Sequence, residues 1–133
     1  MENINMLDNI ICLDNQKIIA ERRLTMTEDV FGDHFPLFPI LPGVLLLEMI
    51  TQSLSVFLNS NQYDTTLKIF FGKIKFQNYA RPGDCLKLEV LLKKATKEEY
   101  IFSAKIKTNS KSVAKIKEVK IIRWGEWLCK REE

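Results

Sequence analysis

The chain has 133 residues, of which 46% are hydrophobic and 28% are charged, with a formal net charge of +3. This size fits one domain spanning residues 1–133, and the composition excludes a disordered or low-complexity chain. The three cysteines lack metal-binding or redox spacing, which predicts free thiols in a reducing compartment and therefore a cytoplasmic protein.

The first half of the chain predicts two strands followed by one long helix. Residues 10–13 and 17–26 have the pattern of strands around a polar turn at 14–16. Residues 44–58 then form an almost wholly apolar run, which predicts a helix that belongs to the core. Because Glu48 interrupts this run, no window is expected to approach a membrane span.

The loop before this helix holds the only histidine of the chain, His34. Pro36, Pro39 and Pro42 follow it, and their fixed φ angles and missing N–H groups rule out a helix and favour a stiff, extended loop. Glu48 lies fourteen residues after His34, inside the predicted helix. Histidine titrates near neutral pH and burial suits a carboxyl group that must donate a proton, so the two residues predict an acid/base couple.

The second half of the chain predicts four strands, at residues 67–78, 85–95, 100–108 and 112–124. Residues 85–95 and 100–108 alternate between apolar and polar side chains, as half-buried antiparallel strands do. In the last strand the apolar phase shifts, which predicts a bulge near residues 117–118. Two strands, one helix and four further strands predict an α+β fold, with residues 125–133 as a short terminal extension.

Lysine is concentrated in the second half of the chain, mainly along the predicted strands. Most of these residues are expected to lie on solvated strand faces. Nucleic-acid binding is disfavoured, because the basic residues alternate along strands without interleaved exposed aromatic side chains.

The segment from His34 to Gln52 reads His-Phe-Pro-x-x-Pro-x-x-Pro-Gly-Val-Leu-x-x-Glu-x-x-x-Gln. It resembles the signature of the β-hydroxyacyl-acyl-carrier-protein dehydratases of the FabZ/FabA type, and residues 75–84 are similar to the strand and Pro-Gly-Asp turn of that family. The resemblance implies the hot-dog fold, in which a curved antiparallel sheet wraps a long central helix. It also implies a homodimer, or an oligomer built from such dimers, whose sheets join edge to edge. Each active site then takes its histidine from one protomer and its carboxylate from the other.

The resemblance and the chemistry of dehydration together predict the roles of the site residues. Loss of water from a β-hydroxyacyl thioester needs a base for the α-proton and an acid for the departing hydroxyl, and we assign these roles to His34 and Glu48. The Gly43 N–H stands where family members supply an oxyanion donor. Gln52, one turn after Glu48, is expected to support that carboxyl group by hydrogen bonding.

The expected partner is an acyl carrier protein that carries the acyl thioester, and coenzyme A is the alternative carrier. A subset of the lysines could guide the acidic carrier protein to the site. No metal ion or organic cofactor is expected, and neither nucleic acid nor a membrane is an expected partner.

The chain departs from the family pattern close to the chemistry. Asp33 stands where glycine is common, Leu37 and Phe38 stand where glycine and a second histidine are usual, and the usual segment ahead of the first strand is not found. Phe38, Met49 and Phe57 are candidates for lining an acyl tunnel, although ordinary core positions explain them equally well. A substrate of specialised acyl or polyketide synthesis is therefore as plausible as one of fatty-acid synthesis.

Two other functions fit parts of the same pattern. A hot-dog thioesterase would release a free thiol from acyl thioesters, but that class relies on other Asp or Glu motifs. A non-catalytic acyl-binding or assembly subunit with this fold would lose nothing except stability when His34 or Glu48 is replaced.

Overall fold

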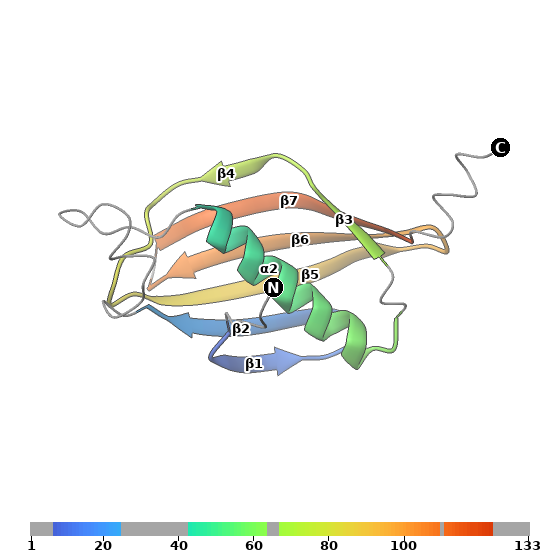
Figure 1. Ribbon diagram of the computed structural model, residues 1–133, viewed down its shortest axis with the longest axis horizontal. Coiled ribbons are helices and arrows are strands. Elements are labelled where there is room, and N and C mark those ends of the chain that lie inside the picture. Colours follow the sequence, from blue (N-terminus) through green and yellow to red (C-terminus); the bar gives the residue numbers. More distant parts are fainter. Residues whose placement is uncertain (1–6, 25–42, 64–66, 110, 124–133) are drawn as a thin grey trace.

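The computed structural model describes residues 7–24, 43–63, 67–109 and 111–123, and across these ranges a single helix packs against one face of an antiparallel sheet (Figure 1). The sheet has the order β1-β2-β5-β6-β7-β3, and the short strand β4 also pairs with β7. The elements are β1 (Asn9–Leu13), β2 (Lys17–Arg23), α2 (Gly43–Ser60), β3 (Leu67–Phe71), β4 (Ile74–Phe76), β5 (Cys85–Ala95), β6 (Glu99–Thr108) and β7 (Lys111–Arg123). The predicted α+β class is confirmed.

The strand predicted over residues 67–78 is two strands, β3 and β4, separated at Gly72. The N–H of Gly72 donates a hydrogen bond to the carbonyl oxygen of Glu118 at 2.8 Å. A Cβ atom at position 72 would lie 2.7 Å from that oxygen, so any other residue would push the strands apart. Glycine is therefore required at the position where the predicted strand is interrupted.

The bulge predicted near residues 117–118 is present in β7. Val119 lies opposite Phe102 and Ile116 lies opposite Ala104, so β7 has one more residue than β6 over this interval. Val119 and Ile116 are both buried, because the extra residue shifts the alternation and returns the apolar side chains to the inner face.

The predicted turn at residues 14–16 is closed by Asp14. One of its carboxylate oxygens accepts hydrogen bonds from the N–H groups of Gln16 and Lys17, at 2.8 and 2.9 Å. These backbone hydrogen bonds lower the pKa of Asp14, because they stabilise its charged form. The turn fixes the register of the β1–β2 hairpin.

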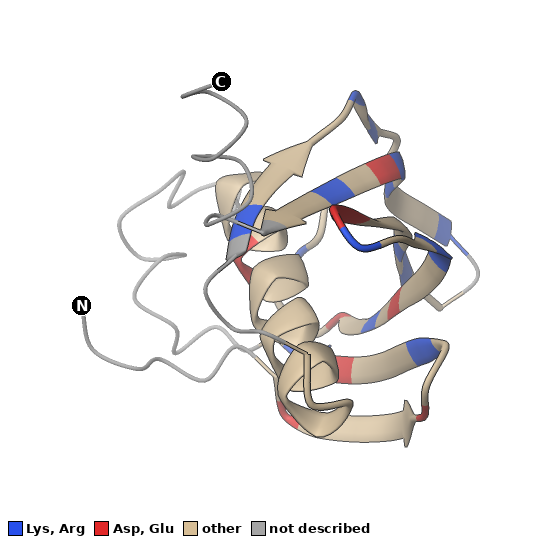
Figure 2. Cartoon of the chain, turned by 90° about the vertical axis from the view of Figure 1, so that its right-hand side faces the viewer, with Lys and Arg blue, Asp and Glu red and all other residues tan. Residues whose placement is uncertain are grey.

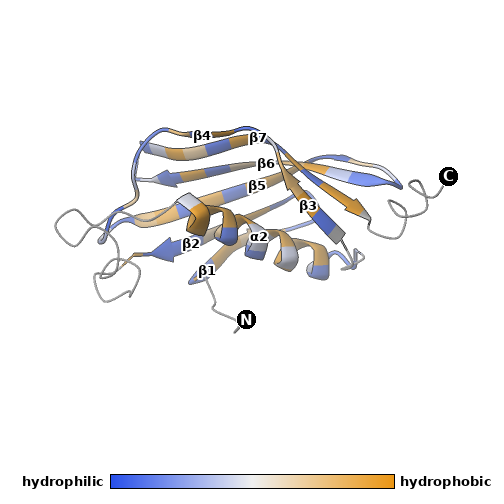
Figure 3. Ribbon diagram, turned by 45° about the horizontal axis from the view of Figure 1, so that its top comes forward, coloured by the Kyte–Doolittle hydropathy of each residue, from blue (hydrophilic) through white to orange (hydrophobic). Residues whose placement is uncertain are grey.

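The core lies between α2 and the sheet. Apolar and polar residues alternate along β5, β6 and β7 (Figure 3), and the apolar set faces the helix. The inward side chains of β6 are all buried, namely Tyr100, Phe102, Ala104 and Ile106. Those of β5 are buried at Leu86, Leu88 and Val90, and Leu92 packs at the margin of the core. This burial holds α2 in a fixed position on the sheet.

The helix α2 has 18 residues and, judged by length and composition alone, is apolar enough to cross a membrane. The expectation that no window approaches such a segment is wrong by this criterion. In the structure, seven side chains of α2 are buried. A core helix passes the same test of length and composition, and α2 packs here as a core helix.

Candidate active site

The candidate residues fall into two groups. Gly43, Glu48, Met49, Gln52 and Phe57 all belong to α2. His34, together with Asp33, Leu37 and Phe38, lies outside the described residues, so its predicted role as the base stays a prediction. The structure therefore describes one half of the predicted acid/base couple.

Glu48 lies on the face of α2 that points away from the sheet. Val44, one turn before it, is 68% exposed, and Ser55, two turns after it, is also exposed. Glu48 itself is only partly buried. The expectation of a buried Glu48 is wrong for the single chain, because the helical spacing of residues 44, 48 and 55 places them on one outer stripe.

Met49 and Phe57 face the opposite way, into the core. Both side chains are fully buried. The ring of Phe57 packs edge-on against Phe102 of β6, with ring centroids 5.4 Å apart. The core interpretation therefore accounts for both residues, and their tentative place in an acyl tunnel stays a prediction.

Gly43 is the first residue of α2, and its small size has a specific cause. The ring of Phe76 on β4 lies against it, and a Cβ atom at position 43 would be 3.0 Å from the Cζ atom of that ring. Its φ angle is not positive, unlike that of Gly83 in the Pro-Gly-Asp turn, so close approach and not backbone conformation favours glycine here. The ring of Phe76 thus packs against the start of the helix.

Phe76 lies next to the candidate site residue Gly43, and the sequence alone did not reveal this contact. It lies within the second motif block, residues 75–84, but no pattern in that block indicates that its ring covers Gly43. Its side chain is 54% exposed, and Tyr79, three residues further, is also exposed. An incompletely covered aromatic surface therefore lies beside the start of α2.

Thr51 and Gln52, the polar residues that follow Glu48 in α2, are placed differently for hydrogen bonding. The hydroxyl of Thr51 donates a hydrogen bond to the carbonyl oxygen of Leu47 at 3.0 Å, so it is satisfied within the helix. Gln52 is partly buried and lies one turn after Glu48, on the same side of the helix. Its predicted support of Glu48 stays a prediction.

Among the described residues, no group of three or more His, Cys, Asp or Glu side chains is arranged to hold a metal ion. A shallow groove of about 360 Å³ lies between β3 and β7, lined by residues that include Phe70, Lys120 and Ile122. None of its lining residues is a candidate site residue.

The model of one protein family, described as ApeI-like, ApeI dehydratase, matches residues 11–117. The chain belongs to the ApeI-like dehydratase family. The match includes the segment from His34 to Gln52 and the Pro-Gly-Asp block. The resemblance to the β-hydroxyacyl-acyl-carrier-protein dehydratases, and with it the prediction of an enzyme of the dehydratase class, is confirmed.

Curated relatives carry the name 3-hydroxyacyl-[acyl-carrier-protein] dehydratase FabZ. The protein of Ligilactobacillus salivarius is 40% identical over 85 residues, which cover 62% of this chain and 61% of the relative. That of Petrotoga mobilis is 36% identical over 94 residues, covering 68% of each chain. That of Enterococcus faecalis is 36% identical over 105 residues, covering 77% of this chain and 74% of the relative. The matched region thus spans about three fifths to three quarters of these relatives.

Solved structures with the same fold include the dehydratase heterocomplex ApeI:P from Xenorhabdus doucetiae. Its chain superposes with a TM-score of 0.69 at 19% identity, covering 92% of this chain and all of that one. Thioesterase superfamily member 2 from Mus musculus superposes with a TM-score of 0.63 at 14% identity, covering 85% of this chain and 80% of that one. At these identities the likeness concerns the fold alone, and it confirms the predicted hot-dog fold.

Proposed function

We propose that the protein dehydrates a β-hydroxyacyl thioester, carried by an acyl carrier protein, to the trans-2-enoyl thioester and water. The pathway is fatty-acid synthesis or a specialised acyl or polyketide synthesis. The observation that carries the proposal is the family match over residues 11–117, because it includes every residue of the predicted acid/base motif. The curated relatives named for the same reaction support it.

In the proposed reaction His34 accepts the α-proton, and the electron pair of that C–H bond forms the double bond between the α and β carbons. The bond from the β carbon to its hydroxyl oxygen breaks, and the proton of the Glu48 carboxyl group goes to the leaving hydroxyl, which departs as water. Negative charge that develops on the thioester oxygen is stabilised by the N–H of Gly43 at the start of α2. The role of Gly43 is supported by its place at the first turn of the helix.

The position of Glu48 supports an active site shared between two copies of the chain. Its carboxyl group lies on the outer stripe of α2, which the sheet of its own chain does not cover. A second protomer that packs on this stripe would exclude water from Glu48 and bring its own His34 loop to the site. We therefore propose a homodimer that acts in the cytoplasm, without a metal ion or an organic cofactor.

The reverse reaction tests this function directly. Hydration of a crotonyl thioester is followed by loss of enone absorbance for the wild type, His34→Ala and Glu48→Gln. Ser55→Ala, on the same exposed stripe of α2, is the matched control. We expect turnover by the wild type and the control, and loss of activity in the two site variants while both remain folded and dimeric.

The rival functions predict different outcomes of the same assay. A thioesterase would release free thiol from the crotonyl thioester, which a thiol reagent detects. A non-catalytic subunit would be inert on crotonyl and on longer acyl chains alike. Either result would overturn the proposed dehydration.

A further inference from the structure

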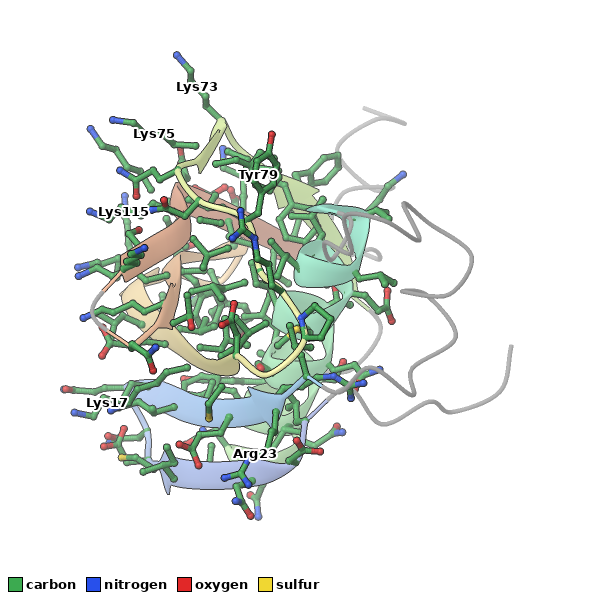
Figure 4. The ribbon with its side chains drawn as sticks, turned by 90° about the vertical axis from the view of Figure 1, so that its left-hand side faces the viewer. Lys17, Arg23, Lys73, Lys75, Tyr79 and Lys115 are labelled. Carbon is green, nitrogen blue, oxygen red and sulfur yellow. The ribbon has the colours of Figure 1, made fainter. Side chains whose placement is uncertain are left out.

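The face of the sheet that points away from α2 carries three lysines in one row across three strands. Lys75 on β4 lies opposite Lys115 on β7, and Lys115 lies opposite Lys105 on β6. All three side chains are exposed, and those of Lys75 and Lys115 extend away from the helix (Figure 4). We call these three residues the lysine row.

The lysine row is electrostatically unfavourable for the isolated chain. Adjacent strands are about 4.8 Å apart, and like charges placed directly opposite one another repel and destabilise a sheet. Glu89 on β5 lies opposite Lys105, but within the described ranges no carboxylate forms an ion pair with any lysine of the row. In the next row Lys107 lies opposite Lys87, and Glu21 of β2 lies opposite Lys87 on its other side, so the uninterrupted run of like charges is confined to the lysine row.

The two faces of the protein differ strongly in charge. Figure 2 shows the charged residues gathered on the strands and α2 almost free of them. Glu48 is the one charged residue of α2, and seven of the helix residues are buried. The outer face of the sheet is therefore the surface on which an anionic macromolecule would find complementary charge.

The lysine row also ends next to the candidate active site. It ends at β4, which lies at the edge of the sheet and, among the described strands, pairs with β7 alone. Along β4, Lys75 faces outward, and the next residue, Phe76, points to the other side and covers Gly43. A partner bound to the lysine row thus lies one strand away from the first turn of α2.

We propose that the lysine row is the docking surface for an acidic acyl carrier protein, whose acylated arm passes around β4 toward Gly43 and Glu48. The identity of the partner rests on the function proposed above. A nucleic acid or an anionic lipid surface would also meet the charge of the row, but neither explains why the row ends at the edge that adjoins the candidate site.

The test uses the full-length protein and two double charge reversals of equal size. Lys75→Glu/Lys115→Glu removes the row. Lys93→Glu/Lys94→Glu places the same charge change on exposed residues at the far end of β5, the end remote from Gly43 (Figure 1). Affinity for a purified crotonyl-acyl carrier protein is measured by titration calorimetry at 50 and 300 mM salt.

We expect the row variant to bind the carrier protein roughly tenfold or more weakly at 50 mM salt, and the control variant to bind like the wild type. The affinity of the wild type should fall at 300 mM salt, where charges on the surface are screened, and that of the row variant should fall less. In hydration assays, the ratio of kcat/KM on the carrier-bound thioester to kcat/KM on crotonyl-N-acetylcysteamine should fall in the row variant alone. Circular dichroism checks that both variants fold.

Several outcomes would overturn the docking proposal without touching the proposed function. Equal loss of affinity in the two double variants would mean that net charge and not the row matters. Binding to phosphatidylglycerol vesicles or to duplex DNA, with no binding of the carrier protein, would assign the row to another partner. Conversely, binding of the carrier that depends on the row in a protein inert on every thioester would uphold the docking surface and reject the dehydratase function.

Discussion

Between α2 and the sheet, the buried side chains are almost all apolar and pack against neighbours from the same chain. The outward surfaces of the helix and the sheet instead carry exposed groups that lack such packing. The helix exposes Val44 and a partly buried Glu48, and the sheet exposes a row of lysines that form no ion pair within the described residues. The inner surfaces account for stability within one chain, whereas the outer surfaces carry groups that become useful only against another molecule. Substitutions on the inner surfaces should therefore change mainly stability, and substitutions on the outer surfaces should change mainly activity or binding.

The largest expected effect is on activity and comes from the outer stripe of α2. Glu48→Gln should lower kcat by about 10²- to 10⁴-fold, the usual contribution of one general acid. Its free energy of unfolding should stay within about 0.5 kcal/mol of the wild type, because the residue is only partly buried and the replacement has the same shape. Initial rates and urea unfolding measure the two effects. A large loss of stability would show that Glu48 is a structural residue.

Replacement of Met49, the next residue in α2, should lower stability much more than activity, the reverse of the effect at Glu48. It is fully buried against the sheet, so Met49→Ala should lower the free energy of unfolding by about 2–5 kcal/mol through lost apolar burial and a residual cavity. At a temperature where the variant is folded, kcat should change far less than in Glu48→Gln. Urea unfolding and initial rates at that temperature measure both. A variant of normal stability with altered acyl-chain preference would instead place Met49 in an acyl tunnel.

Gly43 lies where the inner and outer surfaces meet, and its replacement should have an intermediate effect. Gly43→Ala places a methyl group 3.0 Å from the ring of Phe76, which is half exposed and can move aside. We expect little change in stability but roughly a tenfold loss of kcat/KM, because the methyl group obstructs the approach of the thioester to the Gly43 N–H.

The double variant Gly43→Ala/Phe76→Ala separates two causes of this loss. If the methyl group blocks the substrate, removing the ring should not restore kcat/KM. Recovery in the double variant would mean that the displaced ring caused the loss, and that Phe76 and not the Gly43 N–H limits the reaction. Phe76→Ala alone provides the baseline for the comparison.

Much of the inner surface could be predicted from the sequence. Apolar residues alternate along residues 85–95 and 100–108, and in the structure these are the residues that face the helix. The phase shift near 117–118 corresponds to the bulge in β7. The close approach at Gly72 could not be predicted, because it involves the carbonyl oxygen of Glu118 from a distant strand. Local patterns carry no information on such a contact.

The roles of the candidate site residues stay predictions, and the structure tests only where the residues on α2 lie. The motif identified Glu48 and Gly43 correctly as members of one helix, yet the apolar run around Glu48 suggested a buried carboxyl group. Composition alone was misleading, because the polar residues Glu48, Thr51, Gln52 and Ser55 recur at helical spacing and share the outer side of α2, which places Glu48 away from the sheet. The contact of Phe76 with Gly43 and the alignment of the lysine row, by contrast, depend on strand pairing, which one sequence does not specify.

The smallest expected effect concerns the outer face of the sheet, where docking and stability should oppose each other. Lys115→Glu alone converts the two like-charge neighbours of position 115, Lys75 and Lys105, into opposite-charge pairs. We expect it to raise the free energy of unfolding by about 0.2–1 kcal/mol, the lower end of this range being typical of exposed pairs. Urea unfolding at 50 mM and 500 mM salt measures the gain, which should shrink at the higher salt. Lys93→Glu, outside the row, should give no comparable gain. If Lys115→Glu were neutral or destabilising at low salt, the row would not be unfavourable in the free protein, and no partner would be needed to account for its charge.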